Sequence, residues 1–271
     1  MVANKQVLEF LNFFKGKISI ILENYSSLVH ISERFGSKIS FEKLFLIPPL
    51  IESKYEKKKF PLNKKPLFKR KKNFLSVGAL YYHKPSKNVW WQQKFNTIDY
   101  FPGRTLIHNN ARRLGIDSYS IILEDYSKNN MILFRVFNKI ANILGRRKIR
   151  QKKYYSQKIS KIFSEYKYLF CPEDIFSVLP QFAFHALKSG LIIIGTNSDA
   201  YKSLGFEHGI NYISIGDNWS VENISSTVTQ ISKSYNSNKL NYIHTNSRKH
   251  LVFLNEKTDK QIINLRNYGI I

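Results

Sequence analysis

The sequence predicts an α/β fold in which a Rossmann-like parallel sheet carries helices on both faces. Residues 168–217 show the order strand, helix, strand, loop, strand, and Gly190 closes the helix directly before the apolar run LIII. From residue 73 onward, apolar runs typical of buried strands alternate with segments of helical spacing. Strands that alternate with helices build parallel sheets through crossover connections. With 271 residues and 43% hydrophobic content, the chain can fill one large or two small α/β units.

Local patterns predict the individual elements. Helical spacing of apolar residues predicts helices at 7–14, 26–35, within 97–114, and at 128–166, 178–189, 221–235 and 240–268. Three of these helices stop at Gly36, Gly115 and Gly190, because glycine readily adopts the left-handed conformation that ends a helix. Apolar runs predict strands at 18–22, 44–50, 74–80, 119–125 and 168–171, and two more between Gly190 and Asp217.

The composition indicates a globular protein of a reducing compartment. The chain has no run of about 18 apolar residues, and Lys5, Glu9 and Asn12 interrupt the apolar residues near the N-terminus, so neither a spanning helix nor a signal peptide is predicted. The single cysteine, Cys171, excludes an internal disulfide and a cysteine-based zinc site. We therefore expect a cytoplasmic protein.

The net charge is strongly positive. There are 43 Lys and Arg residues against 19 Asp and Glu residues, which gives +24. A field of this size favours polyanionic partners, namely nucleic acid, an anionic membrane surface or phosphate-bearing ligands. Part of the excess has a compositional explanation, since Lys, Asn, Ile and Tyr are abundant throughout, as an AT-rich genome would cause. The basic residues nevertheless cluster, with ten in residues 54–72 and six in residues 145–153.

A glycine and a lysine follow the predicted strand at 74–80. Gly78 would let the backbone approach a ligand closely, and Lys84, six residues later, would supply a point charge for phosphate oxygens. In a chain with 43 basic residues, a lysine near a glycine is also expected by chance.

The predicted helix at 178–189 is well bounded. Ser177 is the expected N-cap, Pro180 is tolerated in the first turn, and Gly190 lies beyond the last turn. The free backbone N–H groups at its amino end would suit a diphosphate.

One stripe of this helix is polar. Gln181, His185 and Lys188 are spaced i, i+4, i+7, and Glu173 and Asp174 lie just before the helix. These groups make the helix a candidate ligand-binding element. The alternative is that His185 is an ordinary core or surface histidine.

No other catalytic pattern is present. The chain contains no Walker loop, GxGxxG, GxSxG or HExxH motif, and its histidines lack metal-ligand spacing, so neither a metal nor a cofactor is expected. The carboxylates near predicted strand ends could act as bases or as caps, caps being the commoner use: Asp99, Glu124, Asp125, Glu173 and Asp174.

Four segments resemble the GT-B glycosyltransferases of the group 1, family 4-like class. VGALYYHK resembles the strand and loop that open the C-terminal, donor-binding domain of that family, and FAFHALKSGLIIIGT resembles a later helix and strand. LIPPLIESKY is similar to the segment that joins the two GT-B domains, and LGFEHGINYISIGD to a further stretch. The segments occur in the family's order over residues 44–217.

The resemblance implies a division of the chain. Residues 1–50 would be an incomplete N-terminal α/β segment of the GT-B fold, and residues 51–72 a basic linker. Residues 73–235 would be a Rossmann-like nucleotide-sugar-binding domain, and residues 236–271 a C-terminal helical segment.

The resemblance also implies a reaction. A hexosyltransferase would move a sugar from a nucleotide-diphosphate donor to a glycan or lipid-linked acceptor, as in cell-surface polysaccharide synthesis, with the nucleotide-sugar as substrate and no cofactor. Lys84 falls on the family's lysine that neutralises the diphosphate. His185 and Ser177 stand where the family has two glutamates, and Ala79 replaces its arginine. Glu173 or Asp174 could stand in for the first glutamate if the loop is shifted.

These comparisons give the candidate site. The catalytic candidates are Lys84, His185 and Glu173. The donor-binding candidates are Gly78, Ala79, Lys84, Asp174, Ser177, Gln181, His185 and Asn197.

Two other interpretations stay open. Because three of the family's functional residues are replaced and the N-terminal segment is short, the chain could be a catalytically inactive glycosyltransferase-like subunit. A basic nucleic-acid-binding module is the other, although no nucleic-acid-binding motif is present and no nucleic acid partner is expected.

A membrane partner is suggested by residues 131–153. Their apolar residues fall on one side of a helix and precede a basic block, so segments 54–72 and 145–153 suit peripheral attachment to an anionic inner membrane face. A core helix with a solvated basic end explains the same pattern.

Overall fold

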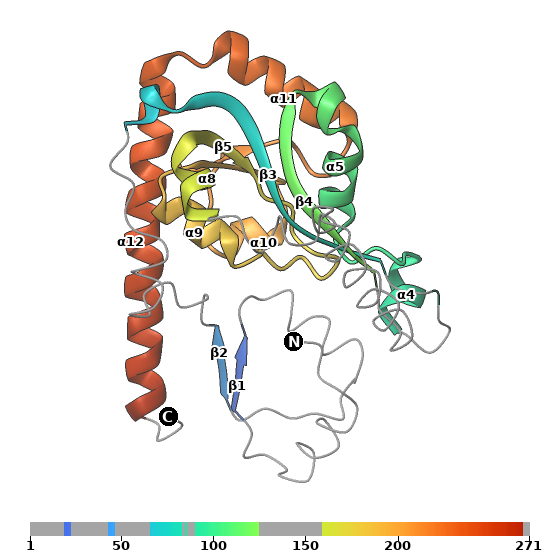
Figure 1. The fold of residues 1–271 in the computed structure, drawn as a ribbon. Coiled ribbons are helices and arrows are strands. Elements are labelled where there is room, and N and C mark those ends of the chain that lie inside the picture. The colour runs from blue at the N-terminus through green and yellow to red at the C-terminus, as the bar shows by residue number, and fades with distance from the viewer. Residues whose placement is uncertain are drawn as a thin grey trace, which may run out of the picture.

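A five-stranded parallel sheet forms the centre of the protein (Figure 1). The computed structural model describes residues 19–22, 43–46, 66–82, 85, 90–124 and 159–267. The strands of the sheet lie in the order β4-β3-β5-β6-β7. Their bounds are β3 (Lys71–Tyr82), β4 (Ile116–Glu124), β5 (Tyr166–Phe170), β6 (Ile192–Gly195) and β7 (Ile213–Ser214). The predicted α/β class and parallel sheet are confirmed.

Helices connect and cover the strands. Their bounds are η2 (Leu67–Lys69), α4 (Trp90–Phe95), α5 (Pro102–Leu114), α8 (Ile159–Glu165), α9 (Phe182–Lys188), α10 (Asp199–Lys202), α11 (Val221–Ser234) and α12 (Ser237–Asn267). The predicted stop of α5 is confirmed, because Gly115 has φ 65° and its N–H binds the last carbonyls of the helix. Helix α4 was not among the predicted helices.

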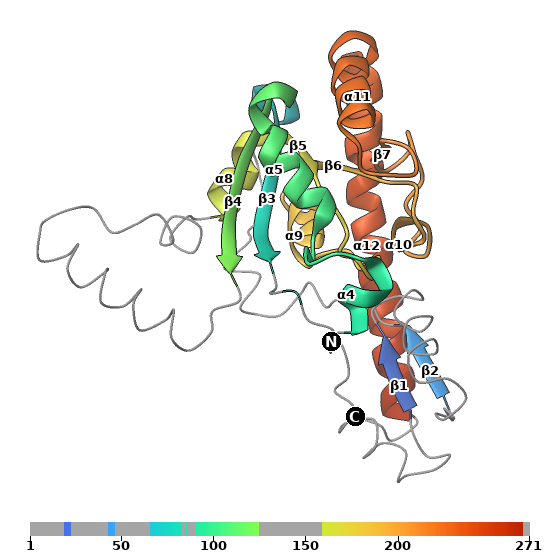
Figure 2. The same ribbon diagram turned by 90° about the vertical axis from the view of Figure 1, so that its right-hand side faces the viewer.

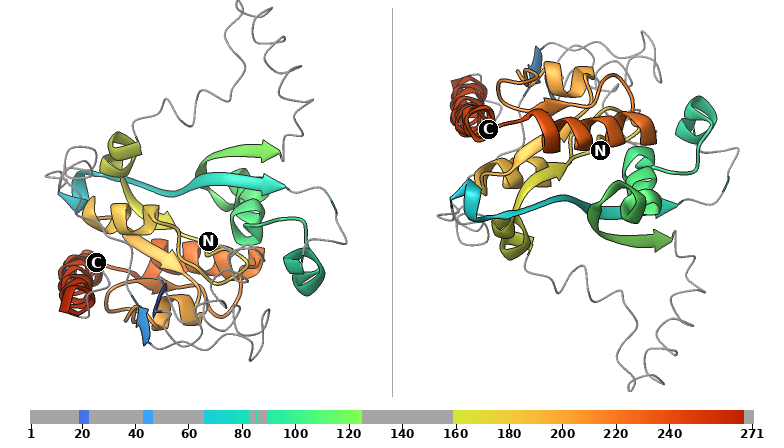
Figure 3. Two further views of the ribbon diagram at one scale, coloured as in Figure 1. Left: turned by 90° about the horizontal axis from the view of Figure 1, so that it is seen from below. Right: turned by 90° about the horizontal axis from the view of Figure 1, so that it is seen from above.

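The core has two sides. Apolar side chains of α5 and α11, such as Ile107 and Ile224, pack together with Phe170 and Ile194 on one face of the sheet. Side chains of α8 and α9 pack on the other face, where Phe163 lies fully buried. Figure 3 shows α8 on one side of β3 and the pair α5–α11 on the opposite side. Helices therefore cover both faces, as the alternation of elements predicted.

Helix α12 bridges the two sides of the core. Near its start Ile243 packs in the cluster shared with α5 and α11, whereas Leu251 and Leu254 pack in the cluster formed by α9 and α10. Figures 1 and 2 show that the C-terminal part of α12 continues past the sheet to the level of β1 and β2.

A second, two-stranded sheet lies apart from the first. It consists of β1 (Ser19–Leu22) and β2 (Lys43–Leu46), which pair in parallel and match two of the predicted strands. In Figure 2 the carboxyl ends of β3 and β4 point toward the side of the molecule where this small sheet lies. The predicted helices at 7–14 and 26–35 and most of the predicted helix at 128–166 lie outside the described residues, whereas residues 67–72 of the predicted linker form η2 and the start of β3.

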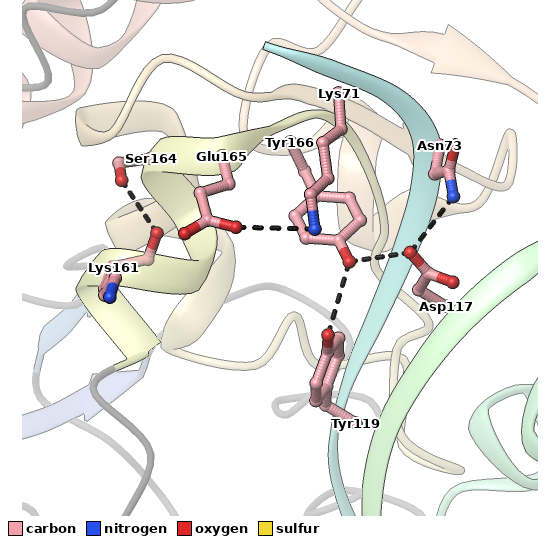
Figure 4. Close-up of polar contacts among 8 residues, drawn as sticks. All are labelled: Lys71, Asn73, Asp117, Tyr119, Lys161, Ser164, Glu165 and Tyr166. Atoms are coloured by element: carbon pink, nitrogen blue, oxygen red, sulfur yellow. Dashed lines mark hydrogen bonds and ion pairs between the residues drawn. The ribbon is translucent and has the colours of Figure 1, made fainter.

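A polar network joins the amino ends of three strands (Figure 4). The hydroxyl of Tyr166 donates to Asp117 Oδ2 at 2.6 Å, and Asn73 Nδ2 donates to the same oxygen at 3.2 Å. Lys71 Nζ forms an ion pair with Glu165 Oε2 at 3.5 Å. Burial, followed by the hydrogen bonds of its hydroxyl to Asp117 and Tyr119, raises the pKa of Tyr166 well above its ordinary value. The network stabilises the register of β3 between β4 and β5.

Candidate functional site

The chain reverses its direction across the sheet between β3 and β5. From β3 it passes through α5 to β4 on one side, and it then returns to β5 on the other side of β3. In open α/β sheets, ligands bind at such a switch point, outside the carboxyl ends of the strands. The pairing of β3 with β5 ends at Ser76 and Phe170, whereas the pairing of β3 with β4 continues to Tyr82 and Glu124. The two strands therefore separate beyond Ser76, and Val77, Gly78 and Ala79 come next.

An arginine side chain lies where β3 leaves β5. Arg104 Nη1 donates to the carbonyl oxygen of Ala79 at 2.7 Å. Gly78 has φ 139°, and a Cβ on it would lie 2.6 Å from Arg104 Nη1, so the missing side chain makes room for the guanidinium. The rings of Phe101 and Phe182 lie 3.8 Å and 5.2 Å from Arg104 Cζ. Sequence reasoning missed Arg104, because its position depends on packing between α5 and β3.

Glu173 joins three elements at the same edge. Its Oε1 accepts a hydrogen bond from Thr196 Oγ1, directly after β6, and its Oε2 accepts one from Trp219 Nε1 at 3.1 Å. Trp219 in turn packs against the backbone of Gly103 in the first turn of α5. The carboxylate thus holds the ends of β5 and β6 and the segment before α11 around the switch point.

Asp174 organises the loop between β5 and α9. Its Oδ1 accepts hydrogen bonds from the backbone N–H groups of Phe176 and Val178, both at 2.9 Å. Burial raises the pKa of Asp174 to about 6, although these two bonds and one from the Tyr100 side chain act in the opposite direction. Ile175 N also donates to the carbonyl oxygen of Tyr100 at 3.2 Å, so the loop is attached to the segment between α4 and α5.

The predicted start of the β5–α9 helix is wrong. Helix α9 begins at Phe182, not at Val178, and Ser177 has φ 57°, a left-handed conformation that an N-cap residue does not adopt. The reason is local, because the Asp174 carboxylate binds the backbone N–H groups of Phe176 and of Val178, the first residue of the predicted helix, and holds this segment in a turn. Ser177 N donates to Asp174 O at 3.0 Å and is part of this turn.

The residues predicted to form a polar stripe on α9 differ in their exposure to solvent. Gln181 is exposed, whereas His185 and Lys188 are each only 7% exposed. His185 is the fourth of the seven residues of α9, in its last turn, and is thus a buried histidine on the helix that follows β5.

Asn197 follows β6 at the same edge. Its backbone N–H donates to Gly216 O at 2.7 Å, and its Nδ2 contacts Asp217 Oδ1 at 3.4 Å. The structure therefore brings Gly78, Ala79, Glu173, Asp174 and Asn197 to one edge of the sheet. Lys84 lies outside the described residues.

The described residues hold neither a membrane-spanning helix nor a cluster of metal ligands. No helix among residues 90–124 or 159–267 is long and apolar enough to cross a membrane. The same part of the chain holds no group of three or more His, Cys, Asp or Glu side chains arranged to bind a metal. The basic segment 145–153 and residues 54–65 fall outside the described ranges.

The fold matches solved glycosyltransferases at low sequence identity. A glycosyltransferase from Rickettsia africae is 14% identical with a TM-score of 0.54, covering 98% of this chain and 67% of its own. The pneumococcal O-GlcNAc transferase GtfA, solved with UDP and GlcNAc, is 15% identical with a TM-score of 0.51, covering 98% of this chain and 48% of its own. HepE from Anabaena, solved with UDP and glucose, is 12% identical with a TM-score of 0.50, covering 97% of this chain and 68% of its own.

These likenesses show that the protein has the fold of GT-B glycosyltransferases. The chain spans about half the length of the pneumococcal enzyme and about two thirds of the other two. No protein-family model and no curated protein sequence matches the chain.

Proposed function

We propose that the protein is a hexosyltransferase that moves a sugar from a nucleotide-diphosphate donor to a glycan or lipid-linked acceptor in cell-surface polysaccharide synthesis. The observation that supports this most strongly is the switch point between β3 and β5, where Gly78 lies beyond the pairing of the two strands and Glu173 and Asp174 follow β5, in a fold shared with glycosyltransferases. Two of the neighbours named above were solved with UDP.

The chemistry of such a transfer assigns roles to the candidate residues. The departing diphosphate develops negative charge, and fixed positive groups lower the barrier by stabilising it. We assign this role to Lys84, and contacts with the donor ribose and sugar to His185 and Glu173. Gly78, Ala79, Asp174, Ser177, Gln181 and Asn197 complete the proposed donor site.

The proposed location is the cytoplasmic face of the membrane. The basic segments 54–72 and 145–153 would attract anionic lipid and keep the enzyme near a lipid-linked acceptor.

Binding of nucleotide-sugars tests the proposal. UDP-, GDP- and ADP-sugars are added separately, and the melting temperature and the release of the nucleoside diphosphate are measured; CMP-sugars, which carry a single phosphate, serve as a comparison. At least one diphosphate donor is expected to raise the melting temperature, and Lys84→Ala is expected to weaken that effect. The matched control is Lys249→Ala, which changes an exposed lysine of α12.

The opposite result would be equally clear. If no donor raises the melting temperature and none is hydrolysed, the chain is not a glycosyltransferase by itself. Binding of nucleic acid with a steep dependence on salt would instead favour the nucleic-acid-binding interpretation.

A further inference from the structure

We propose that Arg104 belongs to the donor site, as a buried cation beside the backbone of Gly78 and Ala79 that stabilises the donor diphosphate. This inference rests on the proposed function and adds a residue that the sequence did not single out. Arg104 is a positioning and electrostatic residue here, because its guanidinium is bonded to the carbonyl of Ala79 and would act on the proposed ligand through its charge.

The position of the guanidinium carries the inference. It lies at the switch point, against Gly78 and on the carbonyl of Ala79, which are the second and third residues of β3 beyond its pairing with β5. Arg104 itself is only 3% exposed. The rings of Phe101 and Phe182 fix the group from two sides, so its charge stays in one place.

The charge of Arg104 acts across the switch point. It favours the ionised form of Cys171, the first residue after β5, and so lowers the pKa of that thiol, while burial raises it more strongly. Cys171 and Ala79 lie on the two strands that separate here, so the positive potential of Arg104 reaches both sides of the opening. An anion bound between the strands would meet this attraction together with the opposing charge of Glu173, which acts on the same thiol with the opposite sign.

The amino end of α5 adds potential of the same sign. Arg104 is the third residue of this 13-residue helix, and the first turn contains no acidic side chain and no side-chain cap. A cation in the first turn is normally unfavourable, because the helix dipole is positive there. A methionine would fill similar space without the cost of burying a charge. A bound diphosphate would make the position of the cation at the amino end of α5 and the burial of its charge favourable instead of unfavourable.

The test separates phosphate recognition from structural support. From UDP, GDP and ADP, the nucleoside diphosphate that binds the full chain most tightly is chosen, and its affinity and that of its nucleoside are measured by calorimetry. Arg104→Met is expected to weaken binding of the diphosphate by 10- to 100-fold, which corresponds to a loss of about 1.4–2.8 kcal/mol of binding free energy. Nucleoside binding is expected to stay within about twofold of the wild type. The matched control is Arg113→Met, at the exposed far end of α5, which is expected to change neither affinity.

A second variant guards against a folding defect. Arg104→Lys keeps the charge on a flexible side chain in the same space, and it is expected to retain diphosphate affinity within about tenfold of the wild type. If Arg104→Met does not fold, Arg104→Gln replaces it as the neutral variant.

The outcomes differ for the two proposals. Unchanged diphosphate affinity in the neutral variant, or an equal loss of diphosphate and nucleoside affinity, would overturn the role of Arg104 while the proposed function stands. A wild-type protein that binds none of the three diphosphates would overturn the proposed function itself, and this inference with it.

Discussion

Trp219 donates its indole N–H to Glu173 Oε2 at 3.1 Å, which connects the segment before α11 to the end of β5. The same indole ring packs against Gly103 of α5. One side chain therefore holds two of the elements that surround the switch point.

Replacing this tryptophan tests the strength of that connection. Trp219→Phe keeps an aromatic ring against Gly103 but removes the hydrogen bond to the carboxylate, so the free energy of unfolding is expected to fall by about 1–2 kcal/mol. Urea denaturation measures the change. The loss should shrink when Trp219→Phe is made in a Glu173→Gln background, since the charge that accepts the bond is then absent. Equal losses in both backgrounds would show that the bond to Glu173 contributes nothing.

Asp174 is expected to make the protein less stable as the pH rises. Its pKa is raised from 3.8 to about 6, so the folded state holds a proton that the unfolded state releases between these values. The free energy of unfolding should therefore fall by about 3 kcal/mol across this window through Asp174 alone. Asp174→Asn removes the titration. The free energy of unfolding is measured by denaturation from pH 3.5 to 7 for both proteins, and the difference between wild type and variant should fall with pH by this amount. A flat difference would contradict the assignment.

His250 is expected to act in the opposite direction. It packs against Phe206 with ring centroids 4.7 Å apart, and burial lowers its pKa from 6.5 to about 4. Between these values the unfolded state binds the extra proton, so stability is complete above pH 6.5 and is lost as the pH falls toward 4, by about 3 kcal/mol. His250→Gln should remove this share of the acid sensitivity in thermal melts, whereas His244, whose pKa burial also lowers to about 4, keeps its own share. If the variant is as acid-sensitive as the wild type, His250 is not the group responsible.

Gly78 is expected to tolerate no side chain. Gly78→Ala would place Cβ 2.6 Å from Arg104 Nη1 on a backbone with φ 139°, so we expect a loss of about 2–4 kcal/mol. Gly209→Ala is the matched control, because Gly209 has φ 75° but nothing lies within 4 Å of the added Cβ. The control should lose only about 1–2 kcal/mol, the cost of the left-handed conformation. Equal losses by denaturation would mean that contact with Arg104 adds nothing.

Vesicle binding tests the proposed membrane contact. The protein is expected to sediment with vesicles containing 30% phosphatidylserine at about 0.05 M salt, and to be released at about 0.5 M salt, because salt screens the attraction. Replacing Arg146, Arg147 and Lys148 by glutamine should reduce the bound fraction several-fold. Replacing Lys202, Lys233 and Lys249, which are exposed in the described part of the chain, serves as the control. Equal effects would indicate attraction by net charge alone.

The sequence predicts the sheet well because its strands are continuous apolar runs. The LIII run after Gly190 became β6, and the stop at Gly115 is set by a single residue's backbone preference. Such signals depend only on residues that are adjacent in the chain, and the tertiary contacts of the protein agree with them.

The start of α9 and the role of Arg104 were not predictable in the same way. Ser177 and Pro180 look like the first turn of a helix, but the carboxylate of Asp174 competes for the N–H groups of Phe176 and Val178. Arg104 carries no local signal beyond being a cation near a helix start, since its partners on β3 and α9 lie 25 and 78 residues away in the chain.

Helix α12 has a mechanical consequence. Leu254 is the last of its residues in the hydrophobic clusters of the described core, and the 13 residues from 255 to 267 continue the helix for about 20 Å beyond that point. A tilt of about 10° at Leu254 would displace the far end by about 3 Å, since this part of the helix is about 20 Å long. A small change in packing between α12 and α9 would thus be converted into a larger displacement on the side of the molecule where β1 and β2 lie.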